Sequence, residues 1–142
     1  ARYEEGFRVT KKEFVHKVAY EGFMLEGQMD RIDEKEGELF VIDYKSGKVP
    51  TTSERTLEST VDFQLAFYAL IANTLGRVKG VYYYDLKEGV LIEENFLEEK
   101  KALLAMKLQE LSKPINGYEL CDEIKHCRVC PYVELCGREE QI

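Results

Sequence analysis

The sequence predicts a fold of the α/β class in its mixed form, an α+β arrangement in which helices flank a central mixed β-sheet. The elements expected along the chain follow the order strands, helix, strands, helix, which is typical of a sheet with helices packed on it. The chain has 142 residues, of which 44% are hydrophobic and 33% are charged. This composition is ordinary for one globular domain that buries a core of its own.

Three strands are expected first, and residues 1–12 receive no assignment. Apolar residues alternate loosely over 13–20, and a Glu-Gly pair then suits a hairpin turn into a second strand over 23–32. The polar stretch 34–37 is typical of a turn between antiparallel strands. The continuous apolar run 39–42 predicts a central strand that is buried on both faces.

A helix is expected next, with Thr60 or Asp62 as its N-cap and Gly76 at its C-terminal end. Its apolar residues recur at helical spacing, which predicts one buried side. These residues are Phe63, Ala66, Phe67, Leu70, Ile71 and Leu75.

Two further strands and a second helix complete the expected core. The strands are predicted over 78–86 and 90–92, and an amphipathic helix is predicted over 97–111. We therefore expect a core domain over residues 1–116 and a Cys-rich C-terminal segment over 117–142 that packs on this core.

The formal net charge of −7 counts against a free-standing nucleic-acid binder, because phosphate contacts are made mainly by Lys and Arg. It is compatible with a metal site, which concentrates carboxylates. No apolar run approaches the roughly 20 residues that span a bilayer, and no signal-peptide pattern opens the chain. We expect a cytoplasmic location and no membrane contact.

Two acids and a lysine occur on two adjacent predicted strands. Asp43 and Lys45 are two residues apart, so their side chains share one face of a strand, and Asp30 lies on the preceding strand. Divalent cations held by carboxylates can activate water and neutralise the charge of a phosphodiester. We interpret Asp30, Asp43 and the backbone carbonyl of Tyr44 as ligands of Mg²⁺ or Mn²⁺, with Lys45 beside the reacting phosphate. The alternative is a surface ion pair at a strand end.

Three separated motifs occur in order: Gly27-x-x-Asp30-Arg31-Ile32-Asp33, Val41-Ile42-Asp43-Tyr44-Lys45-Ser46-Gly47 and Gln64-x-x-x-Tyr68. Together they resemble the RecB-type branch of the PD-(D/E)XK nucleases, which includes the AddB-like nuclease modules of helicase–nucleases. The resemblance runs from about residue 13 to the C-terminus. It implies a restriction-endonuclease-like core, a Mg²⁺ or Mn²⁺ cofactor and a catalytic lysine at position 45.

The resemblance also implies that Gln64 and Tyr68 belong to the catalytic motif and place Lys45, water or the DNA strand. The two residues lie four apart and share one helix face, which on spacing alone could equally be the edge of an amphipathic helix. Asp33 could support the metal or form a salt bridge with Arg31. Many members carry a further acid or His upstream that has no convincing match here, so weak or absent activity of the isolated chain is expected.

All four cysteines lie near the C-terminus, at Cys121, Cys127, Cys130 and Cys136. A reducing cytoplasm argues against disulfides, and four thiolates could hold Zn²⁺ or an iron–sulfur cluster. Cluster-bearing members of the branch use three cysteines spaced like the last three, with a fourth ligand far upstream. No upstream Cys exists here, so Cys121 could substitute. We expect a [4Fe–4S] cluster, with Zn²⁺ and then free thiols as alternatives.

The combined expectation is a metal-dependent DNA nuclease, an exonuclease that hydrolyses phosphodiesters within a DNA repair or recombination helicase–nuclease. Its partners would be DNA and a helicase region or subunit. The first alternative is a non-catalytic scaffold domain of the same fold that binds DNA or protein. The second alternative is a zinc-binding interaction module built on the cysteines.

Overall fold

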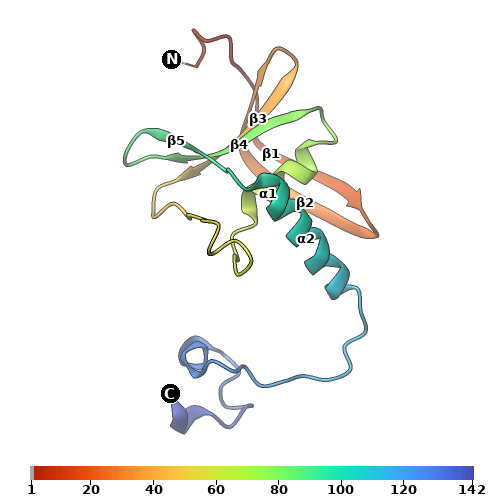
Figure 1. Ribbon diagram of the computed structural model, residues 1–142, viewed down its shortest axis with the longest axis vertical. Coiled ribbons are helices and arrows are strands. Elements are labelled where there is room, and N and C mark those ends of the chain that lie inside the picture. The colour runs from red at the N-terminus through yellow and green to blue at the C-terminus, as the bar shows by residue number, and fades with distance from the viewer. Residues whose placement is uncertain (1) are drawn as a thin grey trace. The chain divides into compact units, whose positions relative to one another are not determined.

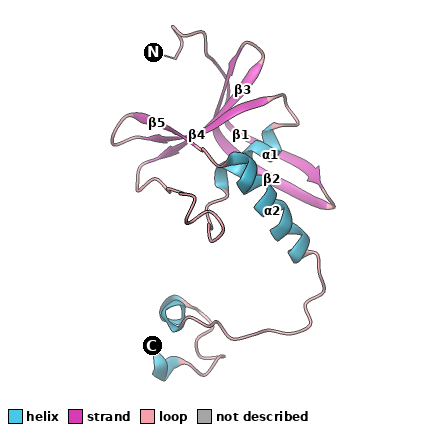
Figure 2. Cartoon of the chain, viewed as in Figure 1, coloured by secondary structure: helices cyan, strands magenta, loops and turns pink. Residues whose placement is uncertain are grey.

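The computed structural model describes residues 2–142, which form two compact units that divide after Glu110. The first unit is a five-stranded mixed sheet with helices (Figure 1). The second unit consists of loops and two short 3-10 helices, Ile124–Val129 and Glu139–Gln141 (Figure 2). The predicted mixed sheet with helices is confirmed. The expected domain boundary, and the packing of the Cys-rich segment on the core, stay predictions.

The sheet has the strand order β1-β2-β3-β4-β5, and the pair β3–β4 is parallel while the other pairs are antiparallel. Glu21 and Gly22 join the first two strands with φ angles of 45° and 85°. Positive φ at both central residues is the type I′ geometry that matches strand twist, and it favours Gly at the second position. The strands are β1 Arg8–Tyr20, β2 Phe23–Lys35, β3 Glu38–Lys45, β4 Val78–Asp85 and β5 Val90–Glu93.

Helix α1 (Gln64–Ala72) connects the parallel strands β3 and β4 and packs across β1 to β4, as a parallel crossover requires. Helix α2 (Leu97–Leu111) contributes Leu97 and Leu108 to the edge of the same core. Within residues 2–142, no helix combines the length and the apolar character needed to cross a membrane. The core between sheet and helix contains fully buried Met29, Ile32, Val41, Leu65, Ala69, Ile71 and Val81.

A second face of the sheet carries aromatic rings and a buried acid. Phe40 contacts Tyr82, with ring centroids 6.4 Å apart. Asp33 is fully buried and accepts hydrogen bonds from Arg31 Nε at 2.6 Å and Arg2 Nε at 2.9 Å. These guanidinium groups bind both carboxylate oxygens of Asp33. This favours a salt-bridge role for Asp33 over a role in supporting a metal.

Three boundaries differ from the expectation. Strand β1 begins at Arg8, because its exposed first residues pair with the long β2 without burying side chains. Helix α1 ends at Ala72, short of Leu75. The predicted cap at Thr60 or Asp62 is wrong, since Phe63 is the N-cap residue and no side chain among residues 2–142 caps this helix.

Candidate active site

The two predicted ligand carboxylates lie on neighbouring antiparallel strands. The β2–β3 ladder ends with Arg31 opposite Ile42, and Asp30 and Asp43 are the next residues of the two strands, close enough for their carboxylates to interact. Side chains of opposite residues share a face of the sheet. The backbone N–H of Tyr44 donates to Asp30 Oδ2 at 2.8 Å, which ties the Asp30 carboxylate to the strand that carries Asp43.

A continuous set of polar contacts joins Asp43 to the rest of the predicted site. Lys45 Nζ lies 3.0 Å from Asp43 Oδ2 and donates to Gln64 Oε1 at 2.6 Å. The Gln64 amide nitrogen donates to Asp43 Oδ1 at 3.1 Å and to the Tyr68 hydroxyl at 3.2 Å. The fold therefore brings Asp43, Lys45, Gln64 and Tyr68 together from a strand and a helix, while their catalytic roles stay predictions.

Asp43 is 4% exposed, and this burial raises the pKa of its carboxyl. The hydrogen bond and the charge of Lys45 lower this pKa, and the nearby Asp30 raises it again. The net direction is upward, because loss of hydration outweighs one ammonium. The surroundings of the Asp43 carboxylate therefore supply too little positive charge to offset its burial.

The residues present fit a divalent cation at this position. Lys45 Nζ lies 3.0 Å from the buried Asp43 Oδ2 and also donates to Gln64 Oε1, so one ammonium serves the Asp43 carboxylate while the nearby Asp30 adds negative charge. Across residues 2–142 no three His, Cys, Asp or Glu side chains gather as a metal site. Two carboxylates suffice for Mg²⁺, which retains several of its waters.

An open depression of about 490 Å³ borders Gln64 and Tyr68. Its wall is mainly apolar and aromatic, which suits the flat face of a base. The lining residues are Glu26, Gly27, Gln28, Val61, Phe63, Gln64, Phe67, Tyr68 and Leu104.

Sequence reasoning missed Tyr83, which pairs with Asp43 across the parallel strands β3 and β4. Its buried ring lies with its centroid 5.1 Å from Lys45 Nζ. It also missed Lys100, which is 1% exposed. One signal was present: Lys100 lies three residues after Leu97 and four before Leu104, so a lysine shares the apolar side of a helix.

The second unit brings its four cysteines to the wall of one cavity of about 180 Å³. Cys127 is buried, and all four are free thiols within the described chain. Cys121 Sγ lies 3.6 Å from His126 Nδ1, and Arg138 donates toward Cys127 Sγ at 3.8 Å. Thiols suit Zn²⁺ or an iron–sulfur cluster, but no ready ligand set exists in residues 2–142, so the cluster stays a prediction.

Comparison with known proteins agrees with this geometry. The family model of the PD-(D/E)XK nuclease superfamily matches residues 1–137, nearly the whole chain. No curated protein matches the sequence. The chain therefore belongs to the PD-(D/E)XK nuclease superfamily.

Proposed function

We propose that the chain is the metal-dependent DNA nuclease domain of a helicase–nuclease and that it hydrolyses phosphodiesters exonucleolytically. One observation carries this proposal: the buried Asp43 carboxylate lies near that of Asp30, and the single ammonium of Lys45, 3.0 Å from Asp43 Oδ2, leaves the pKa of Asp43 raised. A buried carboxylate without full compensation is costly to the fold, which suggests that a bound ligand provides the compensation. The neighbouring Asp30 makes a cation the fitting ligand.

Asp30, Asp43 and the Tyr44 carbonyl would hold Mg²⁺ or Mn²⁺. When bound, the cation supplies Lewis-acid polarisation of the phosphodiester and lowers the pKa of a coordinated water. Lys45 places its ammonium at the same point and would stabilise the negative charge that develops on the phosphoryl oxygens. Gln64 accepts from Lys45 and donates to Asp43, so it fixes the ammonium relative to the carboxylate.

The depression beside Gln64 and Tyr68 supports a single-stranded or frayed end as substrate. Phe63 and Phe67 are partly buried there and present ring surface, and stacking of one base on such a ring contributes about 1–3 kcal/mol. A base that is paired and stacked within a duplex is not available for that contact. A strand end offers such an unpaired base, which is compatible with exonucleolytic cleavage.

The RecB-like or AddB-like subtype, the helicase partner, the role in DNA repair and the cytoplasmic location belong to this proposal. Their support is the order and spacing of the three motifs around Asp30, Asp43 and Gln64. The acidic chain, with its net charge of −7, would depend on a basic track in a larger partner to hold the DNA.

The cleavage test uses the intact parent protein with end-labelled single-stranded DNA and Mn²⁺ or Mg²⁺. Asp43→Asn and Lys45→Met should each lower the cleavage rate at least about 100-fold, the size expected for loss of a transition-state charge partner. Lys79→Met is the matched control, because Lys79 also lies on a strand and pairs with a carboxylate, Glu38, at 3.6 Å. It should leave the rate unchanged.

Undiminished cleavage by both site variants would overturn the assignment. A wild-type parent that binds DNA but neither cleaves it nor binds Mn²⁺ would favour the scaffold alternative.

We also propose that Cys127, Cys130, Cys136 and Cys121 hold a [4Fe–4S] cluster in the intact protein. Their spacing and their shared cavity support this. Anaerobic purification followed by metal analysis tests it: iron with broad visible absorbance is expected. Zinc, or thiols without metal, would contradict the cluster.

A further inference from the structure

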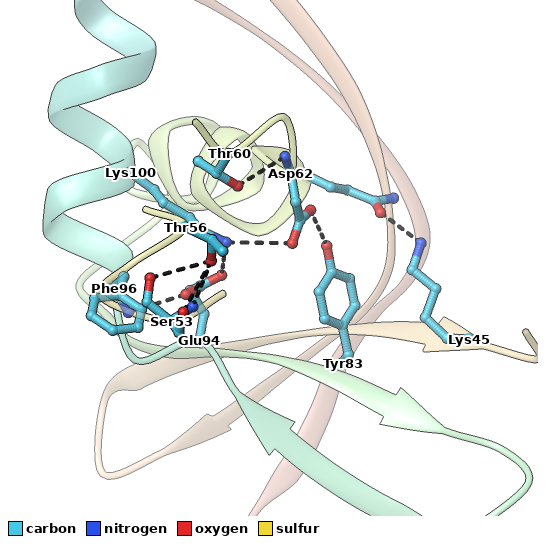
Figure 3. A network of polar contacts seen from close by, with 10 residues as sticks. Lys45, Ser53, Thr56, Thr60, Asp62, Tyr83, Glu94, Phe96 and Lys100 are labelled. Atoms are coloured by element: carbon cyan, nitrogen blue, oxygen red, sulfur yellow. Dashed lines mark hydrogen bonds and ion pairs between the residues drawn. The ribbon is translucent and has the colours of Figure 1, made fainter. Parts of the chain in front are cut away.

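We infer that Asp62, Tyr83 and Lys100 are positioning residues that hold Lys45 and Gln64 in their working geometry. Together with Glu94 they form the Asp62 network (Figure 3). The inference rests on the proposed function for the roles of Lys45 and Gln64, but the geometry it describes can be measured without catalysis.

Lys100 lies at the buried end of this network. It is 1% exposed, and its Nζ lies 2.6 Å from Glu94 Oε2 and 3.4 Å from Asp62 Oδ2. A buried ammonium is tolerated when it is paired with carboxylates. Glu94 in turn accepts from the backbone N–H of Phe96 at the start of α2, so the ammonium links that helix to Asp62.

The second oxygen of Asp62 binds the sheet. Tyr83 donates its hydroxyl to Asp62 Oδ1 at 2.7 Å, and its side chain is 3% exposed. Figure 3 shows Tyr83 rising from its strand toward Asp62, beside Lys45. The ring centroid lies 5.1 Å from Lys45 Nζ, within the range of a cation–π contact. Asp62 therefore restricts the ring against which the ammonium lies.

Asp62 also compensates for a weakness in α1. Gln64 is the first residue of this helix, and no described side chain caps the preceding Phe63. Uncapped helix ends fray, yet Gln64 must hold both Lys45 and Asp43. Contacts from both Asp62 oxygens, two residues before Gln64, fix the chain where the cap is missing.

The test compares Tyr83→Phe, which keeps the ring and removes one hydroxyl, with Lys101→Met. Lys101 is a neighbour of Lys100 on α2 and pairs with Glu98 at 3.2 Å on the surface side, so it controls for loss of a lysine ion pair. Lys100→Met is the stronger perturbation, and Tyr83→Phe remains decisive if that variant fails to fold.

Amide hydrogen exchange measures how firmly the first turn of α1 is held. The Phe67 amide donates to Phe63 O at 2.8 Å in the first turn of α1, and the Asn73 amide donates to Ala69 O at 3.0 Å in the last. Tyr83→Phe should speed exchange at Phe67 about tenfold, as loss of one hydrogen bond to a carboxylate implies, and leave Asn73 unchanged. The side-chain amide signals of Gln64 should shift in the same variant.

In the cleavage assay, kcat of Tyr83→Phe should fall about tenfold while KM stays constant, and Lys101→Met should match wild type in every measurement. Equal acceleration at Phe67 and Asn73 would show a general loss of stability and overturn the inference. So would unchanged exchange and unchanged Gln64 signals. A wild-type protein that cleaves nothing, but in which Tyr83→Phe frees Gln64, would contradict the proposed function and support the positioning network.

Discussion

Helix α1 can place Gln64 and Tyr68 over the sheet because Gly27 has no side chain. A Cβ added at Gly27 would lie 2.9 Å from Ile71 Cδ1, 3.2 Å from Phe67 Cε1 and 3.4 Å from Tyr68 Cδ1. The first distance is shorter than real Cβ contacts allow. Ile71 Cδ1 is the end of a side chain, but Ile71 is fully buried. The substitution Gly27→Ala must therefore push the Ile71 side chain against its packed neighbours or move α1 away from β2.

We predict that Gly27→Ala lowers the free energy of unfolding by about 1–3 kcal/mol, the usual cost of overpacking a core. Gly47→Ala is the matched control in the same unit, because an added Cβ meets nothing within 4 Å and its φ is not positive. That variant should be neutral or stabilised by about 0.4–1 kcal/mol, since alanine restricts the unfolded chain.

Urea unfolding gives both free energies of unfolding. It is followed by far-ultraviolet circular dichroism, because the chain has no Trp to report unfolding by fluorescence. A double-mutant cycle then identifies the clash. Ile71→Val removes the nearest atom, so Gly27→Ala combined with Ile71→Val should be more stable than the sum of the single changes predicts. Equal stability of the Gly27 and Gly47 variants, or strict additivity with Ile71→Val, would refute the packing argument.

Two other predictions concern buried acids. Asp33→Ala should cost about 3 kcal/mol of unfolding free energy in denaturant titrations, because Arg31 and Arg2 lose the carboxylate between them; a change below about 0.5 kcal/mol would contradict this. The raised pKa of Asp43 means that the metal-free folded state binds more protons than the unfolded state between the ordinary Asp pKa of about 3.9 and the raised value. This contribution to stability falls as pH rises through that window and is flat above it. Asp43→Asn should remove this part of the pH dependence and make the metal-free protein more stable at neutral pH, whereas an unchanged pH profile would show that the carboxyl is not perturbed.

The sheet was predictable because hydrophobic pattern and turn chemistry agree. The apolar run 39–42 lies in β3, and Glu36-Gly37 adopts positive φ at both positions. The start of β1 was not predictable, since Arg8 to Lys12 are exposed and all of them except Val9 are polar. Those residues extend by backbone pairing with β2, which leaves no periodic signal.

The candidate site also has a part that the sequence predicts and a part that it does not. Asp43 and Lys45 follow from two-residue periodicity, and the motif spacing adds Asp30 and Gln64. The Asp62 network could not be derived, because it joins residues that are 38 positions apart in sequence, Asp62 and Lys100. A buried lysine depends on where both of its carboxylates lie in space, and local pattern contains no such information.

The proposed nuclease chemistry depends on one divalent cation bound by Asp30 and Asp43 beside Lys45. Calorimetric titration of the intact protein with Mn²⁺ tests this binding without relying on cleavage. Asp85→Asn is a suitable control, because its carboxylate accepts from the backbone N–H of Lys87 at 2.9 Å and belongs to the β4–β5 turn.

Wild type and Asp85→Asn should bind Mn²⁺ at this site, whereas Asp30→Asn and Asp43→Asn should each lose the binding heat while remaining folded. Equal Mn²⁺ binding by Asp43→Asn and wild type would contradict this cation site.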